Sequence, residues 1–151
     1  MTTTCQICGR AIKSKNGLIA HHGYKRPGQG WQTSSCFGAR FRPYEVACDA
    51  LPIAIERAEK WKADKEDRLA DWLTNPPDTI LFQPQRHGYP SGEPIVMNRP
   101  IDYDTHNNRC WTPRTYDAEF KSLRNRWTAD IKNCEIDLEF MHKRVQNWKG
   151  I

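Results

Sequence analysis

The chain has 151 residues, of which 38% are hydrophobic and 11% aromatic. That length suits one globular domain or two small modules, and the aromatic content argues against a wholly disordered chain. We find no apolar run of the ~18–20 residues that a membrane helix needs and no secretory signal at the N-terminus. We therefore expect a cytoplasmic protein that makes no use of a membrane.

The formal net charge is +5, and its distribution is uneven. Residues 1–44 contain seven Lys or Arg and no Asp or Glu, whereas the rest of the chain has 16 basic and 18 acidic residues. Such a basic block favours a polyanionic partner, most often nucleic acid. The alternatives are a basic surface kept for solubility and an interface for an acidic protein.

Residues 1–44 predict a small unit rich in turns. The segment 4–10 has the composition of a tight turn, and residues 17–22 predict a short strand. A second strand is expected at residues 31–33, joined to the first by a connection rich in Pro and Gly at residues 25–30.

Residues 44–73 are helical in composition, with charges of both signs on an exposed face. Pro43 is suited to the first helical position, and Pro52 is expected to kink the helix or divide it. Residues 75–113 then contain seven prolines and predict a long loop with short strands at 80–82 and 94–97.

The segment 114–149 has the most regular pattern in the chain. Its apolar residues recur at intervals of three and four positions, which is typical of one face of a long helix. We expect a helix of about 30 residues, packed antiparallel against the helix of residues 53–73, with a homodimer through the stripe as a further option. The apolar positions are Tyr116, Phe120, Leu123, Trp127, Ile131, Cys134, Leu138, Met141, Val145 and Trp148.

The strongest chemical signal is the pair Cys5 and Cys8, with Gly9 directly after. Two thiolates at this spacing on a tight turn can hold one side of a tetrahedral Zn²⁺ ion. Cys36 is the nearest candidate for a third ligand. Cys48 is the reserve ligand, although its place in an expected helix favours a buried, unliganded thiol.

The fourth ligand is one of two adjacent histidines, His21 and His22. Neighbouring side chains on a strand point to opposite faces, so only one of the pair can face the metal. We favour His22, because Gly23 beside it permits a turn, and keep His21 as the alternative. The predicted site is Cys5, Cys8, His22 and Cys36, holding one structural zinc ion.

These ligand positions resemble a zinc-ribbon or zinc-finger module. The stretch from Ile19 to Cys36 also resembles small proteins of phages and mobile elements, which implies an accessory protein acting in the cytoplasm of a bacterial host. The expected fold is α+β: a basic zinc-ribbon-like module at 1–44, then a helical domain at 45–151. That domain contains the irregular insertion 75–113, and its long C-terminal helix packs as an antiparallel helical hairpin.

A Cys-x2-Cys motif followed by His-His also resembles the start of HNH nucleases. In that family the residue matching His21 activates water and the residue matching His22 helps to hold the metal. The family then needs further Asn or His residues shortly downstream. This chain has no Asn between Asn16 and Asn75. A metal-dependent nuclease is therefore the third-ranked function.

The first-ranked function is non-enzymatic binding of nucleic acid by the basic module. Aromatic rings stack on unpaired bases while Lys and Arg follow the phosphates. The second-ranked function is a module that binds and inhibits or redirects a host protein, with exposed Trp residues as anchors. The predicted nucleic-acid contacts are Lys13, Lys15, Tyr24, Lys25, Arg26, Arg40 and Arg42.

Overall fold

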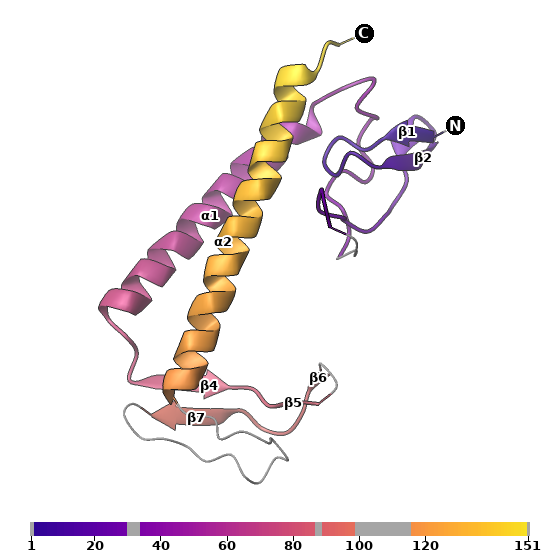
Figure 1. Ribbon diagram of the computed structural model, residues 1–151. Helices are drawn as coiled ribbons and strands as arrows, with labels where there is room; N and C mark the ends of the chain where they lie inside the picture. The colour runs from indigo at the N-terminus through magenta and orange to yellow at the C-terminus, as the bar shows by residue number, and fades with distance from the viewer. Residues whose placement is uncertain (1, 30–33, 87–88, 99–115, 151) are drawn as a thin grey trace. The chain divides into compact units, whose positions relative to one another are not determined.

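The computed structural model describes residues 2–29, 34–86, 89–98 and 116–150. The chain forms two compact units: Met1–Asp64 with Ile131–Ile151, and Lys65–Asp130. The helices α1 (Ala50–Thr74) and α2 (Tyr116–Asn147) each contribute to both units (Figure 1). The mixed α and β content of the expected fold is confirmed. The domain boundary at residue 44 stays a prediction.

The N-terminal part of the first unit is an antiparallel sheet of three short strands, β1 (Thr2–Thr4), β2 (Ala11–Lys15) and β3 (Leu18–Ile19). The turn from Cys5 to Arg10 joins β1 to β2. Asn16 and Gly17 join β2 to β3, both with positive φ (53° and 76°), as a two-residue hairpin turn requires. The strand expected at 17–22 is therefore present but shorter.

Helix α1 begins at Ala50 rather than near Pro43. Pro43 is instead followed by a turn, in which the amides of Val46 and Ala47 bond to its carbonyl oxygen. Pro52 then falls in the first turn of the helix, where a missing N–H breaks no intrahelical bond. The expectation that Pro52 kinks or divides the helix is wrong for this reason.

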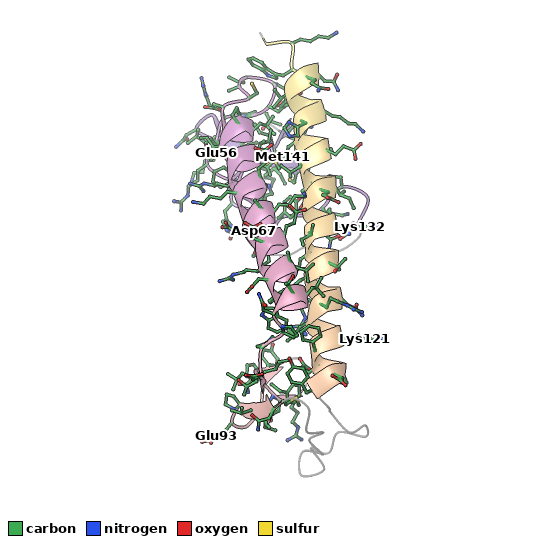
Figure 2. The ribbon with its side chains drawn as sticks, turned by 90° about the vertical axis from the view of Figure 1, so that its left-hand side faces the viewer. Glu56, Asp67, Glu93, Lys121, Lys132 and Met141 are labelled. Atoms are coloured by element: carbon green, nitrogen blue, oxygen red, sulfur yellow. The ribbon has the colours of Figure 1, made fainter. Side chains whose placement is uncertain are left out.

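Helix α2 confirms the long helix expected from the apolar stripe. Within the first unit, its buried residues Cys134, Leu138 and Met141 share a core with Leu51 and Ile55 of α1. Charged residues line the outside of this core, among them the exposed Glu56 and Lys132 labelled in Figure 2. Hairpin packing along the full length of the two helices stays a prediction.

The described residues of the second unit form two small antiparallel pairs of strands. Strands β4 (Thr79–Phe82) and β7 (Ile95–Asn98) pair along four positions, close to the strands expected at 80–82 and 94–97. Strands β5 (Gln85–Arg86) and β6 (Tyr89–Pro90) form the other pair.

Aromatic rings pack together in the second unit: the Trp72 ring is stacked 5.3 Å from the Phe120 ring and tilted against the Trp127 ring at 4.7 Å. Neither helix in the described part of the chain is apolar enough over a sufficient length to cross a membrane. The strand expected at 31–33 lies outside the described residues.

Candidate metal centre

Cys5, Cys8, His22 and Cys36 lie together in the first unit. One donor atom from each residue lies within 4.8 Å of the other three. The Cys5 and Cys36 sulfurs are 3.8 Å apart, and the Cys8 sulfur is 3.4 Å from Nε2 of His22. The four residues singled out from the sequence therefore form one group that could hold a metal ion.

The histidine ring is oriented by the backbone. Nδ1 of His22 lies 2.8 Å from the carbonyl oxygen of Ala20, so it donates its proton there. This tautomer leaves the lone pair of Nε2 directed at the cluster. His21 is exposed, and its Nε2 lies 2.7 Å from the Ser35 hydroxyl instead.

Backbone hydrogen bonds hold the two halves of the site. The Gly9 amide bonds to the Cys5 carbonyl oxygen, and Gly9 has φ of +69°, a conformation that favours glycine. On the other side, the Cys36 amide bonds to the His22 carbonyl oxygen at 2.9 Å. These bonds hold Cys5 next to Cys8 and Cys36 next to His22.

A second glycine, Gly38, makes room for the site. A Cβ atom at this position would lie 2.4 Å from the Cys5 sulfur and 3.1 Å from Cγ1 of Ile7. Any larger residue would therefore displace a ligand. The sequence analysis did not single out Gly38, because only the fold brings it against Cys5.

Clustering of the thiols shifts their ionisation in opposite directions. Hydrogen bonds with Cys36 and then Cys5 hold the pKa of the Cys8 thiol below its usual value. Hydrogen bonds with Cys5 and Cys8, followed by burial, raise the pKa of the Cys36 thiol. A bound cation would stabilise all three thiolates and release protons on binding.

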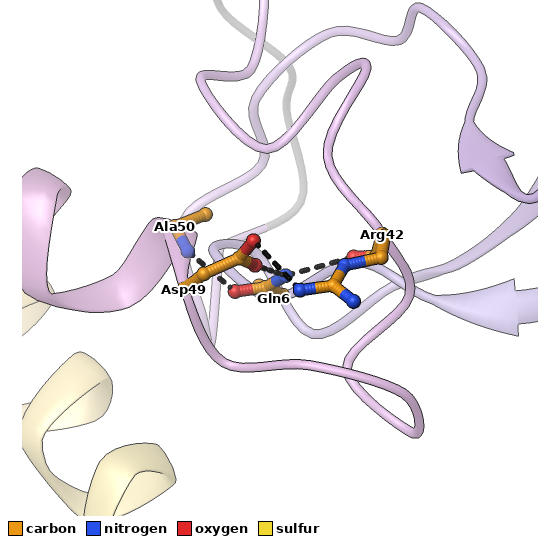
Figure 3. A network of polar contacts seen from close by, with 4 residues as sticks. All are labelled: Gln6, Arg42, Asp49 and Ala50. Carbon is orange, nitrogen blue, oxygen red and sulfur yellow. Dashed lines mark hydrogen bonds and ion pairs between the residues drawn. The ribbon is translucent and has the colours of Figure 1, made fainter.

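Gln6, between the first two ligands, connects the site to helix α1. Its side chain is fully buried, and its Oε1 accepts a 2.8 Å hydrogen bond from the Ala50 amide at the start of α1. Its Nε2 donates to the Arg42 carbonyl oxygen and to the Asp49 carboxylate, both at 2.8 Å (Figure 3). The first turn of α1 is thus capped by the loop that carries Cys5 and Cys8.

Arg144 connects the same loop to the end of α2. Its Nε donates to the Gln6 carbonyl oxygen at 2.8 Å, and its Nη2 donates to that of Cys5 at 3.2 Å. The guanidinium also lies 3.8 Å from the centre of the Tyr44 ring. Nothing in the sequence signals these contacts, because Arg144 is separated from Gln6 by 138 positions and from Cys5 by 139.

Two of the predicted nucleic-acid contacts are engaged within the unit. The Tyr24 hydroxyl donates to Asp137 of α2 at 2.6 Å. Arg26 forms a bidentate pair with the same carboxylate at 2.9 and 3.0 Å, and both side chains are only 19% exposed. These two residues hold the basic module against α2.

The other predicted contacts are more open. Lys13 and Lys15 lie on the exposed side of β2, and Arg40 is exposed as well. Arg42 pairs with Asp49 at 3.3 Å on the surface, and Lys25 is half-buried. Contact of these five residues with nucleic acid stays a prediction.

The cysteines outside the cluster have different outcomes. Cys48 is half-buried and stands outside the cluster. Cys134 is buried, and its thiol donates to the Ala58 carbonyl oxygen at 3.4 Å, which confirms its expected place in the core. Cys110, with His106, lies outside the described residues.

The comparisons give this chain no relatives: no family model matches it, and no curated protein or solved structure shows a significant similarity. The site's chemistry therefore rests on its own donor set, three sulfurs and one imidazole nitrogen.

Proposed function

We propose that this protein binds one structural zinc ion through Cys5, Cys8, His22 and Cys36. In a tetrahedral site with Zn–S bonds of about 2.3 Å, two sulfurs lie about 3.8 Å apart and a sulfur lies about 3.5 Å from an imidazole nitrogen. The observed distances of 3.8 and 3.4 Å agree with these values. Zinc is suited to thiolate and imidazole donors, whereas hard cations such as Mg²⁺ and Ca²⁺ are suited to oxygen donors.

A site with four protein ligands is typical of structural zinc. All four coordination positions would be filled by side chains, which leaves none for water or a substrate. The ion would then stabilise the fold of a module too small to bury a large core of its own. This closed coordination supports a structural rather than a catalytic role for the ion.

We further propose that the zinc-stabilised module binds nucleic acid. The supporting observation is the pattern of charge on its surface. Lys13, Lys15 and Arg40 are exposed, and among the described residues none of the three forms an ion pair. Tyr24 and Arg26 are weaker candidates for nucleic-acid contacts, because both side chains already bond to Asp137 within the fold.

The test is the salt dependence of binding to single-stranded DNA. The variant Lys13→Gln/Lys15→Gln should weaken binding and reduce the slope of log K against log [salt] by ~0.7 for each phosphate that the variant no longer neutralises. The matched control Lys60→Gln/Lys132→Gln removes the same charge from exposed positions of α1 and α2. An equal loss of affinity in both variants would show that only net charge matters, and no binding by the native protein at low salt would overturn the proposal.

The host-protein, homodimer and phage-accessory interpretations stay predictions of the sequence, as does the nuclease. None is favoured by a contact among the described residues, so we rank nucleic-acid binding first.

A further inference from the structure

A pocket of about 260 Å³ lies in the first unit, between the basic module and the two helices. Its apolar wall combines Ile7 and Phe37 of the module with Ala54 and Ala58 of α1 and Met141 of α2. Ala54 and Ala58 are one helical turn apart, so they present the same small-residue face. Because the alanine side chains are small, they leave the pocket open, whereas larger side chains at these two positions would fill it.

Apart from Cys134, the remaining lining residues carry polar side chains. They are Tyr24, Ser34, Ser35 and Asp137. The carboxylate accepts from Tyr24 and Arg26, and it has further lone pairs for a ligand donor. An apolar wall with a few polar groups is the usual composition of a site for a small ligand.

We propose that this pocket binds one unpaired base of a single-stranded nucleic acid. Its volume lies below the ~300–1,000 Å³ of sites for drug-sized ligands, so it suits a single flat ring system. Bases stack on aromatic side chains regardless of sequence, and Phe37 of the pocket wall supplies such a ring. This inference rests on the proposed function.

Charge supports this occupant over an uncharged ring compound. Lys25 follows Tyr24 directly in the chain, and the whole segment 1–44 contains no acidic residue. A nucleotide within a strand has a phosphate on each side, and the basic segment that carries Tyr24 and Phe37 would attract this backbone. Asp137 is already paired with Arg26 and adds little repulsion.

The first experiment compares single-stranded DNA with an abasic strand of equal length and charge. The native protein should bind the strand with bases about tenfold more tightly, because one stacked base contributes roughly that factor. Ala58→Leu fills the pocket and should abolish this preference, whereas the salt slope should not change. Ala63→Leu, at an exposed position of the same helix, is the matched control and should keep the preference.

The second experiment does not depend on a variant that folds. Adenosine and cytidine monophosphates are titrated into the native protein, and the methyl resonances of Ala54, Ala58 and Met141 are followed by NMR. Saturable shifts at these methyl groups, larger than those with ribose phosphate, would support the pocket. Absence of such shifts, or a base preference that persists in Ala58→Leu, would overturn it.

The outcomes separate this inference from the function on which it rests. Equal binding of both strands with an unchanged methyl spectrum would overturn the pocket and leave phosphate binding intact. Failure of both strands to bind, with methyl shifts from the monophosphates, would overturn nucleic-acid binding and support a nucleotide site.

Discussion

At the scale of single residues, the adjacent histidines show how the chain separates two equivalent candidates. His22 turns Nε2 toward the sulfurs because Nδ1 donates to the Ala20 carbonyl oxygen. His21 lies on the exposed side and contacts Ser35. The alternation of side chains along an extended segment accounts for the difference.

The two histidines give a matched pair of variants. His22→Ala should lower zinc affinity by more than the roughly 10- to 100-fold that removal of a ligand's hydrogen-bond partner costs. His21→Ala should change it at most a few-fold. Competition with a chromophoric chelator measures both affinities. Equal affinities for the two variants, or a larger decrease in His21→Ala, would show that His22 is not the ligand.

The clustering of the four candidate ligands could be predicted from the sequence, because their donor chemistry and spacing can be recognised there. Cys5 and Cys8 are three positions apart, and the choice of His22 over His21 followed from the neighbouring Gly23. Gly38 could not be predicted, since its closeness to the Cys5 sulfur exists only after folding. The engagement of Tyr24 with Asp137, 113 positions away, was hidden for the same reason.

At the scale of elements, the loop between Cys5 and Cys8 is the point to which both helices are tied. Gln6 caps the start of α1, and Arg144 near the end of α2 donates to two carbonyl oxygens of the loop. Trp148 adds a hydrogen bond from its indole to the Tyr44 carbonyl oxygen at 2.8 Å. The metal site and the helix ends therefore share one set of hydrogen bonds.

Arg144→Ala should lower the free energy of unfolding of the zinc-loaded protein by about 1–3 kcal/mol, because it leaves carbonyl oxygens without their partner. The neighbouring Lys143→Ala is the control. Its ion pair with Glu139 is exposed and screened by solvent, so its removal should leave the free energy of unfolding nearly unchanged. Urea unfolding measures both. Equal stability of the two variants would show that the Arg144 hydrogen bonds contribute nothing.

Helix boundaries were less predictable than helix existence. The apolar stripe of α2 repeats over many turns, so its length followed from the pattern alone. The start of α1 depended on Gln6 and on the turn after Pro43, which are tertiary features. The sequence pattern starts the helix near residue 44 and so places Pro52 in its interior. Because α1 begins at Ala50, Pro52 lies in the first turn, where a proline is compatible with a helix.

At the scale of the whole molecule, the first unit combines the two ends of the chain around the candidate metal site. Segments 1–64 and 131–151 meet there, and Arg144 near the C-terminus donates to the carbonyl oxygen of Cys5 near the N-terminus. The sequence pattern predicted a basic module and a long helix separately. It held no signal that Asp137 and Arg144 would join them.

X-ray absorption at the zinc edge of the purified protein tests the central claim most directly. We expect one zinc ion per chain, with three sulfur neighbours at about 2.3 Å and one nitrogen neighbour at about 2.0 Å. A protein that is folded without zinc, or a shell of oxygen neighbours, would contradict the account.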